Sequence, residues 1–135
     1  MKPVITPEES ARLDAAATDP VEVLMERAGL GVALAAVRMG ARYGTRVLAL
    51  AGPGNNGGDA LVLLRNLAAW GRPVTAILIG ERGGDEDLLH GWGIRTFVDS
   101  DYQGRASLLD GELARASVIV DGVLGTGGGG AAAAP

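Results

Sequence analysis

The segment RVLALAGPGNNGGDALVLLRNLAAW, residues 46–70, joins two apolar runs through a polar, glycine-rich stretch. The first run, RVLALAG (46–52), is too short for a helix and is typical of a buried strand in a parallel sheet. The second, ALVLLRNLAAW (60–70), has apolar residues at helical spacing and is followed by Gly71 and Pro73, which end helices. The segment therefore predicts a strand, a polar loop and a helix in that order.

The same alternation of strand and helix continues toward the C-terminus. The predicted elements are strands over 73–80, 94–98 and 117–125, a helix over 106–116, and a loop with at most two helical turns over 81–93. Strands that alternate with helices at this spacing form right-handed crossovers. We therefore expect a doubly wound, Rossmann-like α/β fold, in which helices cover both faces of a parallel sheet.

Two helices are expected before the first strand. Thr6 and Glu9 predict a capping box at the start of a short helix that reaches about Ala17. The sequence DPVE (19–22) repeats this pattern ahead of a long, mostly apolar helix that ends near Gly40. The sheet is thus predicted to follow an N-terminal pair of helices.

Composition limits the kind of partner. The chain has 135 residues, a formal net charge of −4 and a pI of about 4.9, so it lacks the positive field that attracts nucleic acids. It has no cysteine, no stretch resembling a signal peptide and no apolar run of membrane-spanning length. We expect a soluble cytoplasmic protein with no nucleic-acid partner and no membrane partner.

The polar stretch between the first strand and its helix matches a dinucleotide fingerprint. Gly52, Gly54 and Gly57 fit the pattern G-x-G-x-x-G, and Glu81 would serve as the ribose-binding acid of an NAD-dependent dehydrogenase. Asp59 argues against this interpretation, because a carboxylate at the start of the helix repels a pyrophosphate. The stretch fits better a site for hydroxyls, amides or a cation.

The simplest alternative is a helix cap without any ligand. Asn56 would be the N-cap and Asp59 its capping-box partner. A cap needs one asparagine and one aspartate, whereas this stretch has two asparagines and four glycines. The surplus indicates a ligand site, in which Gly57 and Gly58 allow close approach to the backbone.

Three motifs, in this order, resemble those of the NAD(P)HX epimerase family, also known as the YjeF N-terminal domain. They are LMERAG (24–29), GPGNNGGDALVLLRNL (52–67) and VIVDGVLGTG (118–127). The resemblance implies an isomerase that interconverts the R and S epimers of the hydrated cofactors NADHX and NADPHX. An ADP/ATP-dependent NAD(P)HX dehydratase would act on the product. The resemblance also implies a potassium ion as cofactor and a homodimer.

The resemblance implies a set of site residues by matching positions. The substrate-binding residues would be Asn55, Asn56, Gly57, Gly58 and Asp59, with Gly125, Thr126, Gly127, Gly128, Gly129, Gly130 and Ala131. Asn56 and Asp121 would hold the potassium ion. Hard oxygen ligands of this kind suit an alkali cation.

Asp59 and Asp121 are the candidate catalytic residues. Epimerisation at a carbon that bears a hydroxyl beside a ring nitrogen proceeds through loss and re-addition of the hydroxyl or through ring opening. Both routes need a proton donor and a proton acceptor beside the oxygen, and a carboxyl group can act in either role. We therefore expect at least one of these aspartates to take part.

Family members continue with a strand that reads roughly VDIPSGL, which these 135 residues do not contain, and residues 127–135 are GGGGAAAAP. We expect a single YjeF N-terminal-like domain over 1–135, incomplete at its C-terminal end. The alternative function is a non-catalytic dimeric ligand-binding or scaffold module of the same fold. The intact NNGGD and GTG motifs favour the enzyme over this alternative.

Overall fold

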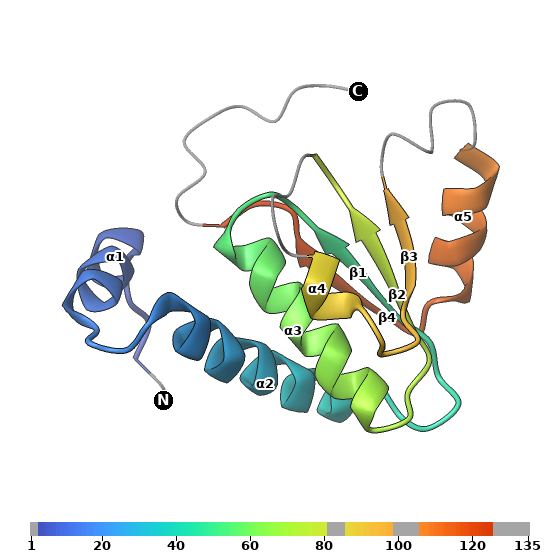
Figure 1. Cartoon of the computed structure of the whole chain (residues 1–135), viewed down its shortest axis with the longest axis horizontal. Helices are drawn as coiled ribbons and strands as arrows, with labels where there is room; N and C mark the ends of the chain where they lie inside the picture. Colours follow the sequence, from blue (N-terminus) through green and yellow to red (C-terminus); the bar gives the residue numbers. More distant parts are fainter. Residues whose placement is uncertain (1–2, 81–85, 99–105, 126–135) are drawn as a thin grey trace.

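A parallel four-stranded sheet organises the chain in the computed structural model, which describes residues 3–80, 86–98 and 106–125 (Figure 1). The strands are β1 (Val47–Ala51), β2 (Val74–Leu78), β3 (Arg95–Val98) and β4 (Val118–Gly122). The helices are α1 (Pro7–Ala16), α2 (Val21–Met39), α3 (Asn55–Ala69), α4 (Glu86–Leu89) and α5 (Ala106–Arg115). The strands run in the order β3-β2-β1-β4, so the first strand in sequence is central.

The burial of β1 explains its continuous apolar sequence. β1 pairs in parallel with β2 on one side and with β4 on the other. Val47, Leu48, Ala49 and Ala51 are all fully buried, including neighbours whose side chains point to opposite faces of the sheet. A strand covered on both faces needs apolar residues at successive positions rather than at alternate ones.

Helices cover both faces of the sheet, as the sequence predicts. The helix α3 packs on β1, β2 and β4, and α2 packs chiefly against α3. Figure 1 shows α5 on the opposite side of the sheet from α3. The doubly wound α/β prediction is therefore confirmed.

The LMERAG motif docks α2 on α3. Gly29 is buried, and a Cβ atom there would lie 2.5 Å from the Cβ of Val62, so only glycine allows the two helices to approach this closely. Glu26 of the same motif forms an ion pair with Arg65 on α3. The motif thus positions α2 beside the middle of α3.

The predicted helix starts have different outcomes. The Thr6–Glu9 capping box is present, with Glu9 N donating to Thr6 Oγ1 at 3.2 Å and Thr6 N donating to the Glu9 carboxylate at 2.7 Å. The second predicted cap is wrong, because Pro20 is the N-cap of α2 and no side chain caps the helix. Asp19 instead forms an ion pair with Arg27.

The helix α3 begins at Asn55, five residues before its predicted start at residue 60. Gly54 is its N-cap, and Gly58 N donates to Gly54 O at 3.2 Å, so the polar stretch forms the first helical turn rather than a loop. Gly57 and Gly58 are both buried there. The polar side chains therefore stand on a regular helix, which holds them more rigidly than a loop would.

None of the helices described by the structure combines the length and the apolar character needed to cross a lipid bilayer.

Candidate functional site

The segments that follow β1 and β4 meet at the carboxyl edge of the sheet. Ala51 and Gly122 are paired in register at the ends of these two adjacent strands. One residue further on, Gly52 N donates to Gly122 O at 3.0 Å. This is the edge at which open α/β sheets bind ligands, and the topology predicts that these two segments meet there.

Two glycines make the contact between the segments possible. A Cβ atom on Gly52 would lie 2.0 Å from Val123 O, and one on Gly122 would lie 2.9 Å from Ala60 Cβ. Neither glycine was among the predicted site residues, although a glycine that ends a buried strand is a sequence signal of close backbone approach. The backbones of β1, α3 and β4 therefore lie in contact because these two positions lack side chains.

The role of Gly52 also bears on the dehydrogenase interpretation. Its lack of a side chain is explained by the contact with Val123, with no pyrophosphate needed. Glu81, the expected ribose-binding acid, lies outside the described residues. The structure thus gives the first glycine of the fingerprint a packing role.

Asn56 ties α3 to the segment after β4. Its Nδ2 donates a hydrogen bond to Leu124 O at 2.9 Å, across 68 residues of sequence. The capping interpretation of Asn56 is therefore wrong, because Gly54 is the N-cap and no side chain caps the helix. A Cβ atom on Gly125 would lie 3.2 Å from Asn56 Cβ, which shows how tightly this segment lies against α3.

Asp121 lies at the exposed carboxyl end of β4. Its Oδ1 accepts a hydrogen bond from Val123 N at 3.0 Å, which fixes the carboxylate in a local turn. Within the described chain no hydrogen bond joins Asp121 to Asn56. Their hydrogen bonds use Nδ2 of Asn56 and Oδ1 of Asp121, so Oδ1 of Asn56 and Oδ2 of Asp121 are the further oxygen donors of the two side chains.

These two atoms bear on the potassium site that the resemblance implies. Both are hard oxygen donors, and they come from adjacent segments at one edge of the sheet. An alkali cation prefers such ligands, whereas a thiolate or imidazole set would favour a transition metal. The donor chemistry of Asn56 and Asp121 therefore fits potassium.

Asp59 occupies a more enclosed environment than Asp121. It is half-buried on α3, and burial raises the pKa of its carboxyl group above the ordinary value of 3.8. The negative charge of Asp14 on α1 raises the same pKa further. Asp59 therefore holds its proton to a higher pH than a solvated aspartate does.

The remaining predicted residues divide between α3 and the chain beyond β4. Asn55 is exposed on the first turn of α3, next to the buried Gly57 and Gly58. Gly125 is exposed at the end of the described segment. The predicted residues outside the described part of the chain are Thr126, Gly127, Gly128, Gly129, Gly130 and Ala131. The structure therefore brings Asn56 against Leu124 and Gly125, a few residues after Asp121 at the end of β4. Asn55, Gly57, Gly58 and Asp59 lie on the same first turns of α3, where Asp59 feels the charge of Asp14 on α1.

Comparison with known families gives one match over most of the chain. A family model described as "YjeF-related protein N-terminus" matches residues 21–135. The match includes all three motifs and begins where α2 begins.

Several curated relatives are similar in sequence. The NAD(P)H-hydrate epimerase of Cenarchaeum symbiosum is 46% identical over 88 residues, which cover 61% of this chain and 39% of the relative. The NAD(P)H-hydrate epimerase of Lentilactobacillus buchneri is 35% identical over 132 residues, 94% of this chain and 60% of the relative. The bifunctional NAD(P)H-hydrate repair enzyme Nnr of Hyperthermus butylicus is 36% identical over 108 residues, 77% of this chain and 20% of the relative. The chain thus spans less than two thirds of the length of each of these relatives.

A solved structure has the same fold. The crystal structure of the yeast protein ynu0 (YNL200c) superposes with a TM-score of 0.79 at 25% sequence identity. The superposition covers 99% of this chain and 61% of the yeast chain. The N-terminal helices and the parallel sheet therefore belong to an arrangement already observed by experiment.

Proposed function

The chain belongs to the family of YjeF-related protein N-termini, and we propose that it acts as an NAD(P)H-hydrate epimerase. This isomerase would interconvert the R and S epimers of NADHX and NADPHX. The curated relatives that carry the name of this activity support the proposal. The observation that carries it is the junction of α3 and β4, where Asn56 donates to Leu124 O, three residues after Asp121.

The two aspartates suit complementary roles in the reaction. Asp59 retains its proton to a higher pH because its pKa is raised, and it would donate that proton to the oxygen at the reacting carbon. Asp121 is exposed and held in place by Val123 N, and its carboxylate would accept the proton that is released. Loss and re-addition of the hydroxyl, or opening of the ring, both require such a pair.

The backbone of α3 would bind the substrate. Asn55 offers an exposed amide on the first turn of α3, and the lack of side chains at the buried Gly57 and Gly58 would let the substrate approach this turn closely. Gly125 and the segment 126–131 would complete the pocket, as the resemblance implies. A potassium ion would be held by Asn56 and Asp121 and would supply a positive charge that offsets the nearby carboxylates.

The cellular setting is part of the same proposal. The bifunctional name of the Hyperthermus butylicus relative supports a functional link to an NAD(P)HX dehydratase, which would act on the epimer that this enzyme supplies. We further propose a cytoplasmic homodimer. The non-catalytic module is less favoured, because the curated relatives are named as enzymes.

Chromatography of the epimers tests the proposal. The purified protein is mixed with one resolved epimer of NADHX in potassium buffer, and the appearance of the other epimer is followed. We expect conversion well above the spontaneous rate, and a slower rate when tetramethylammonium replaces potassium. A folded protein that gives only the spontaneous rate would contradict the proposal.

Variants assign the roles of the aspartates. Asp59→Asn and Asp121→Asn should each lower the rate by about a hundredfold, the usual contribution of one acid or base group. Asp110→Asn, at an exposed position on α5, is the matched control and should leave the rate unchanged. If both site variants keep the full rate while folding normally, the assignment is wrong.

A further inference from the structure

A cavity of about 320 Å³ lies at the amino edge of the sheet, opposite the candidate epimerase site. It is lined by residues at or before the starts of β1, β2 and β3, by the end of α3, and by the turn before β3. The five residues of β1 separate the two edges by about 16 Å. The cavity is therefore distinct from the site around Asn56 and Asp121, and none of the site residues lines it.

Three arginines from three separate segments line this cavity. They are Arg46 before β1, Arg72 after α3 and Arg95 on β3. None of the described residues that line the cavity is acidic. Guanidinium groups that converge from different segments are the usual protein ligands of phosphate and carboxylate groups.

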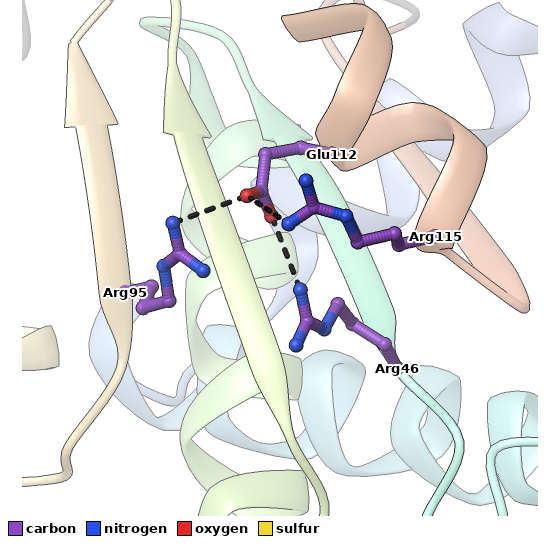
Figure 2. A network of polar contacts seen from close by, with 4 residues as sticks. All are labelled: Arg46, Arg95, Glu112 and Arg115. Atoms are coloured by element: carbon purple, nitrogen blue, oxygen red, sulfur yellow. Dashed lines mark ion pairs between the residues drawn. The ribbon is translucent and has the colours of Figure 1, made fainter. Parts of the chain in front are cut away.

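A buried glutamate orients two of these arginines. Glu112 on α5 is 4% exposed, and its Oε1 lies 3.1 Å from Arg95 Nη2 while its Oε2 lies 3.5 Å from Arg46 Nη1. Figure 2 shows these groups, with Arg115 of α5, converging on the one carboxylate. Arg46 Nη1 and Glu112 Oε2 are both fully buried, and they face one another as an ion pair without a hydrogen bond within the described chain. One carboxylate thus holds the arginines in place without neutralising them.

Arg72 is fixed in a different way. Its Nη1 donates to Trp70 O at 2.7 Å and its Nε donates to Ala41 O at 3.3 Å. The first bond offsets the partial negative charge at the C-terminal end of α3, which would otherwise repel an anion. These two bonds use Nε and Nη1, and the guanidinium group has five N–H donors, so donors remain for a ligand.

The cavity also has an aromatic side chain in its lining and a volume that suits a small molecule. Trp92 lines the cavity and is 46% exposed, and Thr75 adds a hydroxyl group. A volume near 320 Å³ is at the lower end of the range for small-molecule sites, about 300–1,000 Å³. An indole beside guanidinium groups suits a ligand that has both a flat ring and an anionic group.

We propose that this cavity binds a small molecule with a phosphate monoester and a planar ring, the chemistry of a nucleoside monophosphate. The three lining arginines leave an excess of positive charge, because no lining residue is acidic and the nearby Glu112 is shared with Arg115 of α5. A phosphate monoester carries about −1.5 to −2 at neutral pH and matches this excess, whereas a carboxylate carries only one charge. The phosphate lies among the arginines, and the ring lies against Trp92.

Fluorescence of Trp92 tests the proposal on the full chain. The protein has two tryptophans, so Trp70→Phe leaves Trp92 as the single reporter. The variant is titrated at constant ionic strength with adenosine monophosphate, adenosine and inorganic phosphate. We expect a saturable change with the monophosphate, weaker binding of adenosine, and competition by inorganic phosphate. If none of the three gives a saturable change, the proposal is wrong.

Substitutions locate the ligand within the cavity. In the Trp70→Phe background, Arg95→Gln should weaken monophosphate binding about tenfold, as expected for loss of one charged hydrogen bond. Arg38→Gln, at an exposed position of α2, is the matched control and should change the affinity less than twofold. Equal affinities in the two variants would overturn the proposal.

Two further measurements keep the test decisive. Trp92→Leu leaves every ion pair of Glu112 intact. It should also weaken binding of the monophosphate, which is measured by calorimetry. This variant covers the case that Arg95→Gln does not fold. Asp121→Asn should leave binding unchanged. Loss of binding in Asp121→Asn would place the ligand at the other edge and contradict the proposal. Inorganic phosphate that binds as tightly as the monophosphate would show that the ring plays no part.

Discussion

The two edges of the sheet are built in opposite ways. At the carboxyl edge the backbones of β1, α3 and β4 lie in contact, because Gly52 and Gly122 have no side chains. At the amino edge, long charged side chains fill the space around the buried Glu112. The arginines paired with it are Arg46, Arg95 and Arg115. Close backbone contact holds a few short polar groups rigidly, whereas long side chains leave a cavity that a ligand can enter. This contrast agrees with the proposals that place catalysis at the first edge and anion binding at the second.

A side chain placed between the contacting backbones at the carboxyl edge should have the largest effect on stability. In Gly52→Ala the new Cβ would lie 2.0 Å from Val123 O, so the two segments must move apart. We expect a loss of about 3 kcal/mol in the free energy of unfolding, measured by urea denaturation.

Gly31→Ala is the control for this substitution. A Cβ atom on Gly31 meets nothing within 4 Å, and alanine favours a helix interior by about 1 kcal/mol over glycine. It should therefore stabilise the protein. A Gly52→Ala protein as stable as the wild type would show that the edge does not depend on close backbone contact.

Removing the central charge of the amino edge should have the next largest effect. Glu112→Gln leaves Arg46, Arg95 and Arg115 without their shared anion. The arginines are partly exposed, so we expect a loss of about 2 kcal/mol rather than the larger value for a fully buried pair. Denaturation by urea measures it. Asp19→Asn breaks the exposed pair with Arg27 and should change stability by less than about 0.5 kcal/mol.

Loss of a single hydrogen bond should have a smaller effect on stability. Asn56→Ala removes the bond from Nδ2 to Leu124 O and should lower the free energy of unfolding by about 1 kcal/mol. The same variant should need a higher potassium concentration for half-maximal epimerisation. Asn66→Ala is a useful comparison, because its Nδ2 donates to Val62 O within the same helix. If the potassium concentration for half-maximal epimerisation does not change in Asn56→Ala, Asn56 does not hold the ion.

The smallest expected effect is the pH dependence that Asp59 contributes. A carboxyl group with a raised pKa binds its proton more tightly in the folded state. Its favourable contribution is therefore complete below the ordinary value of 3.8 and is lost as the pH rises through the raised value. The free energy of unfolding of the wild type relative to Asp59→Asn should therefore fall as the pH rises from 3.8 through the raised pKa of Asp59. A difference that stays constant with pH, as expected for Asp110→Asn, would contradict the raised pKa.

The contrast between the edges also explains how much the sequence predicts. The strands were predicted to within three residues, for example 46–52 against Val47–Ala51, because continuous apolar runs bounded by glycine are a strong signal. The carboxyl edge was also recognisable, since its residues lie in two short motifs. The start of α3 was missed, because asparagine, glycine and aspartate are poor helix formers and the helix depends on its neighbours to begin at Asn55.

The amino edge could not be predicted from the sequence. Arg46, Arg95 and Glu112 are far apart in the chain, and each alone is typical of an exposed side chain. Their meeting depends on the strand order and on which face of α5 lies against the sheet. Likewise, Gly29 was known only as part of a motif, and its packing against Val62 became clear from the structure.

Epimerisation by variants at the two edges tests most directly the claim that catalysis belongs to the carboxyl edge. Initial rates of conversion of one NADHX epimer are measured for the wild type, Asp121→Asn and Glu112→Gln, each expressed per folded molecule. We predict a loss of about a hundredfold in Asp121→Asn and an unchanged rate in Glu112→Gln. A full rate in Asp121→Asn, or an equal loss in both variants, would contradict the account.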